Sequence, residues 1–385
     1  MTTQTIPAPT APRRPHLRFR GRDIPVVLPN RRDARLKLSA VIMALQVLGQ
    51  TMLGFKLSIA QILITIGVSA LVEIVVTYRR QAMLVWPASA MLTGNSVAFI
   101  LRASGTRHGD WWSLHGIQYF VLAALLSLLS KYLIRPGDRH LFNPSNVGLV
   151  WCLLVIGPNH VFPQYLWWGP NDAGVALAYA VIIAGAAWIL PSVRMVAMAL
   201  SFLLTFAVLV GIFALNGNHF FAIWHEGPVE GLSYWANLAL SPEVLIFVFF
   251  MMSDPQTAPR TRLGRILYGG GTALLAAGLL SFQTTEFAVK LAVLSSLTVT
   301  CALVPFMESL ARRVERRRLA VVPSPLAVAS SPFLPRLAGA VRAVRNPAIA
   351  AAVIIAVAAP ANTAALAGNE KILLIEKGLA GKDAQ

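Results

Sequence analysis

The sequence predicts an all-helical polytopic membrane protein of about ten spanning helices, arranged as two inverted halves of five with broken helices. Three observations predict this fold class: the composition, the spacing of apolar runs and the distribution of basic residues. Of the 385 residues, 56% are hydrophobic and only 13% are charged, and the mean hydropathy is +0.64. A water-soluble chain could not bury that much apolar surface, so most of it is expected to face lipid.

Ten apolar runs approach the length of about 20 residues that crosses the hydrocarbon of a bilayer. They are 38–55, 57–78, 86–101, 117–134, 143–157, 173–190, 194–215, 236–253, 265–282 and 286–307. If the N-terminus is cytoplasmic, nearly all basic residues before position 319 fall on the inner side. The exceptions are Lys56, Arg102, Arg107 and Lys290. Because cytoplasmic loops of membrane proteins are enriched in Lys and Arg, this split predicts a multi-pass protein of the bacterial inner membrane with its N-terminus inside.

Residues 1–37 are polar, Pro-rich and basic, with no apolar core of a signal peptide, which predicts a cytoplasmic arm against anionic lipid. The integral domain covers 38–310, and a basic, then Pro/Ala-rich linker covers 311–346. Residues 347–367 are apolar but contain Pro360 and Asn362, so an eleventh span and a tail to 385 stay open. The net charge of +17 is explained by basic cytoplasmic segments, and no specific nucleic-acid partner is predicted.

Two halves of five spans, about 38–157 and 173–307, would enter the membrane in opposite orientations, as in inverted-repeat transporters. Weak internal echoes favour this arrangement. The third span begins Trp86-Pro87, and the eighth contains Ser241-Pro242. The fifth span begins with FNPSN at 142–146, and the tenth follows FQTTE at 282–286.

Candidate binding residues are polar side chains at predicted helix breaks and helix starts. Irregular backbone in hydrocarbon is tolerated only against protein or water, and helix starts present free N–H groups that suit anionic or amide-bearing ligands. The candidates are Thr93, Asn95, Asn143, Ser145, Asn146, Asp254, Thr257, Gln283, Thr284 and Glu286. For any one of them a helix cap is the competing interpretation, since Asn-Pro and Asp-Pro are common turn and cap signals.

Two further acids lie within or near spans, where an unpaired charge is costly. Glu243 is expected either to pair with a base from a neighbouring helix or to stay neutral. Glu73 is expected near the inner headgroups, beside Arg79 and Arg80.

The predicted outer loops are rich in Trp and His, a pattern most typical of interfacial anchoring. Metal-ligand types also occur there, in His108, Asp110, His219, His225 and Glu226. No run has a tight ligand spacing such as HExxH, so no metal site is predicted. Cys152 and Cys301 are too few for a disulfide framework, and no Walker A loop or GxGxxG fingerprint is present.

Two motifs resemble a known pair. LFNPSNVGLV at 141–150 and MMSDPQTAPRTRLGRILYGG at 251–270 are similar to the FNPA-type and TDPxTxP-type motifs of the NqrB/RnfD superfamily of membrane subunits. HGDWW, WWGP, WHEGP and QTTEFAVK most resemble the UnbU-like branch, first named from enediyne biosynthesis, over about 80–310. The matching positions are Asn143, Pro144, Asn146, Asp254, Pro255, Thr257 and Pro259.

The resemblance implies a urea-transporter-like ten-helix fold and flavin-dependent electron transfer with other membrane or periplasmic subunits. In that family FMN is joined by a phosphoester to the Thr of an S-G-A-T motif. Here residues 151–190, where the motif is expected, contain no Ser or Thr, and 172–175 (DAGV) is the nearest shape. Covalent FMN at that position is therefore not expected, and a non-covalent flavin (FMN or riboflavin) stays open.

Three functions are compatible with these observations. The first is a redox-complex subunit that binds flavin non-covalently or scaffolds partners that do. The second is a solute transporter or channel that uses the inverted-repeat cavity. The third is a membrane scaffold for a biosynthetic or envelope pathway, with Trp111, Trp112 and His225 docking an exported partner.

Overall fold

The computed structural model describes residues 15–19, 22–30, 33–135, 139–164 and 172–320. The linker after 320, the apolar stretch 347–367 and the basic residues Arg13, Arg14, Arg20, Arg31 and Arg32 lie outside these ranges. Within them the chain is mostly helical. The helices of the first half are α1 (Ala34–Thr51), α2 (Ile59–Gln81), α3 (Ala88–Ile100), α4 (Ile117–Leu133) and α5 (Pro144–Ile156).

The second half contains α6 (Ala173–Ile189), α7 (Val196–Leu215), α8 (Gly231–Ala239), α9 (Pro242–Ile246), the π-helical turn η1 (Phe247–Met251), α10 (Arg262–Leu280) and α11 (Glu286–Ala320). Each predicted apolar run contains helix. The eighth predicted run, 236–253, contains parts of α8, α9 and η1, because the chain is interrupted at Leu240 and restarts at Pro242. Ser241 caps the new helix by accepting from the Val244 N–H over 3.2 Å.

Five helical segments of the described chain are long and apolar enough to cross a membrane: Ile59–Gln81, Val196–Leu215, Gly231–Met251, Arg262–Leu280 and Glu286–Val314. Four more, α3 to α6, are apolar but shorter. These helices make the chain a multi-pass membrane protein. Its ten-span topology and its orientation stay predictions.

The described residues also contain short strands, which the sequence did not predict. β1 (His16–Phe19) and β2 (Arg22–Val27) form an antiparallel hairpin, and β2 pairs in parallel with β3 (Leu84–Val85), between α2 and α3. β4 (Leu101–Ala103) pairs with β5 (Val161–Pro163), and β6 (Phe220–Phe221) with β7 (Pro228–Val229). Strands this short carry too few alternating residues to be recognised from sequence.

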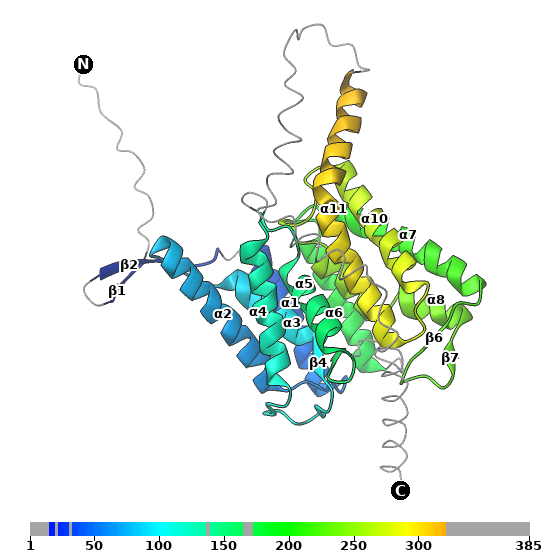
Figure 1. The fold of residues 1–385 in the computed structure, drawn as a ribbon, viewed down its shortest axis with the longest axis horizontal. Coiled ribbons are helices and arrows are strands. Elements are labelled where there is room, and N and C mark those ends of the chain that lie inside the picture. The colour runs from blue at the N-terminus through cyan, green and yellow to red at the C-terminus, as the bar shows by residue number, and fades with distance from the viewer. Residues whose placement is uncertain (1–14, 20–21, 31–32, 136–138, 165–171, 321–385) are drawn as a thin grey trace.

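Figure 1 shows α2 and α7 at opposite sides of the bundle, with α5 and α11 between them. The burial agrees: 28% of the most apolar window is buried in both α2 and α7, against 83% in α11. Helices on the outside expose apolar faces to lipid, whereas α11 packs against α5 and α10. The two halves also meet where α1 packs against α6.

Candidate functional site

A cavity of about 640 Å³ lies where the ends of several helices meet, and we call it the large cavity. Its walls come from the starts of α1, α3 and α5, the ends of α2, α4 and α6, and the segment after η1. Four of the predicted site residues line it: Thr93, Asn143, Ser145 and Asp254. The structure therefore brings residues of the two motifs, more than 100 positions apart in the chain, to one space.

Asn143 organises the start of α5. Its Oδ1 accepts from the backbone N–H of Asn146 over 3.2 Å and from the Ser145 hydroxyl over 2.9 Å. Its Nδ2 donates to the carbonyl of Met251 over 2.9 Å. Asn143 is thus a helix cap, as the competing interpretation held, and also a direct link to η1.

Asp254 also lines the large cavity. Its Oδ2 lies 3.3 Å from Nε2 of His140, and its Oδ1 accepts from the Gln256 N–H over 2.9 Å. Nearby, Arg139 donates to the carbonyls of Pro255 and Ala258 over 2.5 and 3.0 Å. Burial and, secondarily, the neighbouring Arg260 lower the pKa of Arg139. The loop before α5 and the loop after η1 are therefore held together by side chains.

One largely buried ion pair lines the side of the cavity formed by α2 and α4. Lys131 Nζ lies 2.7 Å from Glu73 Oε1 and donates to Ser89 Oγ over 3.0 Å, while Glu73 Oε2 accepts from the Ala90 N–H over 2.7 Å. The position of Glu73 near the inner headgroups stays a prediction, and the structure shows that it lines the cavity together with Arg80. Glu73 also accepts from an N–H at the start of α3 and pairs with Lys131, because a largely buried carboxylate needs both an ion partner and N–H donors.

The same wall carries two more arginines and an aromatic ring. The guanidinium of Arg80 lies 5.6 Å from the ring centre of Tyr132, and Lys131 Nζ lies 5.5 Å from it. Arg80, Arg135, Tyr132 and Phe250 all line the cavity. The wall thus offers arginines beside aromatic surface, a combination suited to an anionic ligand with a planar ring.

At the entrance Asp33 caps α1 and pairs with Arg35, with Oδ2 2.5 Å from the guanidinium. This hydrogen bond holds the pKa of Asp33 below its ordinary value and raises the pKa of Arg35. Both residues line the large cavity. The start of α1 therefore adds one acid and one base to the cavity, so its net charge does not change. The lining is basic overall, because Lys and Arg outnumber Asp and Glu in it.

Three predicted residues, Asn95, Asn146 and Thr257, are buried near the cavity but do not line it. Asn146 Nδ2 donates to the Leu294 carbonyl and to Thr298 Oγ1, both over 2.9 Å, and so ties α5 to α11. Thr257 Oγ1 lies 3.3 Å from the Asp254 carbonyl. Asn95 Oδ1 is buried without a hydrogen-bond partner among the described residues. Asn146 and Thr257 support the cavity wall rather than facing its contents.

The second motif lies in the part of the chain that resembles known proteins. Residues 162–315 match the NQR2, RnfD, RnfE family. The match runs from β5 into α11 and includes Asp254 and Thr257, whereas the first motif with Asn143 precedes it. No curated protein matches the chain. The match supports a relationship to the NqrB/RnfD superfamily. It covers the second motif, at 251–270, and so agrees with the motif resemblance in the second half of the chain.

Residues 172–175 (DAGV), the nearest shape to the flavin-attachment motif that the resemblance leads one to expect, lie at the start of α6. Asp172, in the DAGV sequence, is the N-cap of α6, and its Oδ1 accepts from the Val175 N–H over 2.8 Å. A Cβ added at Gly174 would approach Met52 Cβ to 3.1 Å. A carboxylate cannot form the phosphoester of a Thr hydroxyl, and the start of α6 is packed against α1. Residues 172–175 therefore offer no hydroxyl to which a phosphate could be esterified, and the absence of covalent FMN stays a prediction.

The last three predicted residues, Gln283, Thr284 and Glu286, lie at the start of α11, away from the large cavity. The Thr284 carbonyl accepts from the Phe221 N–H over 2.8 Å, and Gln283 Nε2 donates to Leu279 over 3.1 Å. Glu286 is 3% exposed and lies 2.6 Å from Lys290 Nζ. Thus only Glu286 belongs to a buried polar cluster.

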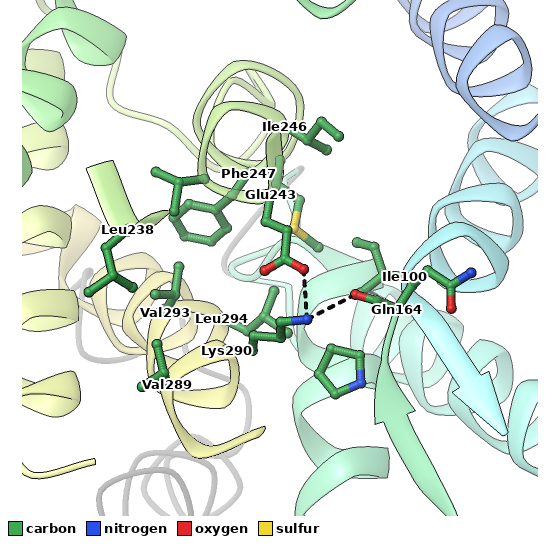
Figure 2. Close-up of a pocket in the computed structure, with 13 residues that line it drawn as sticks. Ile100, Gln164, Leu238, Glu243, Ile246, Phe247, Val289, Lys290, Val293 and Leu294 are labelled. Carbon is green, nitrogen blue, oxygen red and sulfur yellow. Dashed lines mark hydrogen bonds and ion pairs between the residues drawn. The ribbon is translucent and has the colours of Figure 1, made fainter. Parts of the chain in front are cut away.

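Lys290, the partner of Glu286, lines a second, small cavity of about 50 Å³ together with Glu243 and Gln164, as Figure 2 shows. Lys290 Nζ lies 2.8 Å from Glu243 Oε1 and donates to the Gln164 carbonyl over 3.2 Å. Glu243 therefore pairs with a base from another helix, one of the two expectations. Lys290 and Arg102 were predicted at the outer face of the membrane, and the structure shows both side chains buried, at 5% and 3% exposure. The sequence did not identify Lys290 as the base that pairs with Glu243, because the two residues lie in distant segments of the chain.

Met251 lines both cavities. It ends η1, where the Met252 N–H bonds to the Phe247 carbonyl over 2.9 Å instead of to the fourth residue back. Such π-helical turns are rare and frequently occur at functional sites. The large and small cavities thus adjoin the same side chain from two sides.

The His residues of the loops before α4 and α8 make local contacts. His115 Nε2 lies 2.8 Å from the Ser104 carbonyl, His108 Nδ1 lies 3.2 Å from the Phe55 carbonyl, and the His225 ring contacts Trp224. Within the described residues, no three His, Cys, Asp or Glu side chains gather as a metal-binding group.

Proposed function

We propose that this chain is a membrane-embedded subunit of an NqrB/RnfD-type electron-transfer complex, of the UnbU-like branch, that binds FMN or riboflavin non-covalently in the large cavity. The observation that carries the proposal is the convergence of Asn143 and Asp254 on a cavity with a basic and aromatic wall. Its volume of about 640 Å³ lies within the range of about 300–1,000 Å³ usual for organic ligands.

The donor set of the cavity fits such a cofactor. Arg80 and Arg135 would hold a phosphate or another anionic end, because guanidinium groups donate paired hydrogen bonds to it. Tyr132 and Phe250 would contact the ring, and the Ser145 hydroxyl lies on the polar wall. A bound flavin supplies one- and two-electron transfer, while the protein residues orient it and exclude water. Other membrane or periplasmic subunits would deliver and remove the electrons.

The ten-helix inverted repeat is part of this proposal. The pairing of α4 with α5 recurs as α10 with α11, that of α2 with α4 as α7 with α10, and that of α1 with α3 as α6 with α9. Pairings of this kind are expected of two halves that share one fold in opposite orientations.

The proposal is tested by absorption and fluorescence spectra of the detergent-purified protein before and after acid precipitation. Flavin released into the supernatant is expected. The double variant Arg80→Gln/Arg135→Gln should retain roughly tenfold less flavin, since a hydrogen bond to a charged group contributes about 1.5–3 kcal/mol. Arg107→Gln, exposed in the loop after β4, is the matched control and should retain it fully.

A colourless protein from its native host would contradict the proposal. So would flavin that stays in the acid pellet, because a covalent link would then exist elsewhere in the chain.

A second function is favoured by the position of Met251. Two cavities that adjoin one side chain suit a solute pathway closed at that point, and a channel or transporter uses such an arrangement. Liposome flux would then fall with Asn143→Ala or Asp254→Ala and rise with Met251→Ala. Flux that none of the three variants changes would exclude this function.

A further inference from the structure

A hairpin of the N-terminal arm forms a surface with the turn between α2 and α3. β2 pairs with β3 through Val26–Leu84 and Val27–Val85, and the Trp86 N–H donates to the Val27 carbonyl over 2.8 Å. Ile24, on β2, is 6% exposed and anchors the hairpin. We call the hairpin together with residues 78–86 the hairpin platform.

The platform lies at the level of helix ends. It is joined in sequence to the start of α1, and its third strand connects the end of α2 to the start of α3. Figure 1 shows the hairpin beside the end of α2 and outside the helix bundle. Because α2 is an outer, lipid-facing helix, its ends lie near the headgroups of the bilayer. The platform therefore extends laterally over the membrane surface rather than over the protein.

The exposed side chains of the platform are of two kinds. Large apolar and aromatic groups are Leu17, Leu28, Tyr78 and Trp86, with 49%, 61%, 39% and 48% of their surface exposed. Exposed basic groups are His16, Arg18, Arg79 and Arg80. Asp23 is the only acid in the hairpin. Trp, Tyr and Leu beside Arg are the combination that enters a headgroup region and pairs with anionic phosphate.

We propose that the hairpin platform is a binding surface for anionic phospholipids of the surrounding membrane. Leu17, Leu28 and Trp86 enter the boundary between headgroups and acyl chains, and Arg18 and Arg79 pair with headgroup phosphates. Basic residues at a surface are attracted by anionic lipid, and apolar side chains beside them set the depth. The platform adjoins the large cavity, because Arg80 and Gln81 line that cavity, but Leu17, Arg18, Arg79 and Trp86 do not. The proposal therefore rests on these four residues and is independent of what the cavity binds.

The test uses the full-length chain carrying Leu17→Cys, labelled with an environment-sensitive fluorophore. Cys152 and Cys301 are 0% exposed, so the label is directed to the new thiol. The protein is placed in phosphatidylcholine vesicles with and without 30% phosphatidylglycerol. A blue shift and quenching by spin-labelled lipid are expected only with phosphatidylglycerol, and 1 M salt should reverse both because surface charges are screened.

The double variant Arg18→Gln/Arg79→Gln should weaken the response roughly tenfold or more, since each basic residue near the surface contributes about fivefold. Lys56→Gln/Arg107→Gln removes the same charge at the other ends of α2 and α3 and should leave the response unchanged. A label on Leu114→Cys, 56% exposed in the loop before α4, should not distinguish the two vesicles.

Equal emission in both vesicles would overturn the proposal, as would a response that the control double variant reduces equally. Flavin content or flux, measured on the same samples, reports the cavity separately, so failure of one proposal is distinguishable from failure of the other.

Discussion

Asn143 Nδ2 donates to the carbonyl of Met251 over 2.9 Å, and this bond connects the first motif to the end of the π-helical turn. A carbonyl at a helix end has no partner within its own helix. Here the partner is a side chain from the other half of the chain. One amide therefore caps α5 with its oxygen and holds η1 with its nitrogen.

Replacing Asn143 by Ala should destabilise the protein by about 1–3 kcal/mol, because a cap and a buried hydrogen bond are lost together. Thermal unfolding in detergent measures the change. Asn237→Ala is the matched control, since its Nδ2 bonds only within its own helix, to Ser233, and should have little effect. Equal melting temperatures for the two variants would show that the link to η1 carries no stability.

The pair of Glu73 and Lys131 should show strong coupling. Glu73→Gln leaves Lys131 buried at 12% side-chain exposure without its ion partner, and a loss of about 3–5 kcal/mol is expected. Glu73→Gln/Lys131→Met removes both charges and should recover most of that loss. A double-mutant cycle on thermal stability measures the coupling energy. If the stability losses of the two single variants simply add up in the double variant, the two charges are not coupled and the pair is screened by water.

Close packing of α7 and α10 depends on one glycine. A Cβ at Gly269 would contact the Met198 carbonyl, whereas a Cβ at Gly278 of the same helix meets no atom within 4 Å. Gly269→Ala should therefore cost about 1–3 kcal/mol by separating the helices, and Gly278→Ala should be neutral or stabilise by up to about 1 kcal/mol. Gly269→Ala should therefore melt at a lower temperature than Gly278→Ala. The reverse order would contradict the close contact of α7 and α10 at Gly269.

The cap of α1 should make stability depend on pH. The pKa of Asp33 is held below its ordinary value of 3.8 by the hydrogen bond from Arg35. A depressed folded-state pKa contributes stability that is present above the ordinary value and is lost as pH falls through the lowered one. Asp33→Asn should thus melt below the wild type at neutral pH and equal it in strong acid. A difference that persists in acid would assign the effect to the cap geometry alone.

The helical segments were predictable from sequence because long apolar runs must lie in lipid or inside the bundle. There the backbone N–H and C=O groups have no water to bond to, so the chain forms helices. α5 begins one residue from its predicted start, because Asn143-Pro144 is both a cap signal and a helix start. Broken helices were predicted, but the exact position of the break at Leu240 was not. An apolar sequence continues through it, and only the Ser241-Pro242 pair, read as an echo, indicated a new helix start.

The candidate site was predictable in part. Thr93, Asn143, Ser145 and Asp254 meet because helix starts and breaks gather at one end of the bundle. Gln283 and Thr284 do not join them, since the start of α11 lies at the other end. The ion pairs of Glu73 with Lys131 and of Glu243 with Lys290 connect residues 58 and 47 positions apart, and no periodicity within one helix encodes such contacts.

The length of α11 has a consequence for how the chain leaves the membrane. Its 35 residues correspond to about 52 Å at 1.5 Å per residue, well beyond the roughly 30 Å of hydrocarbon. Figure 1 shows its C-terminal end projecting past the other helices. About four turns of α11, which carry several arginines, are therefore expected to extend beyond the hydrocarbon into water. This extension is a surface that a soluble protein can bind without contacting lipid.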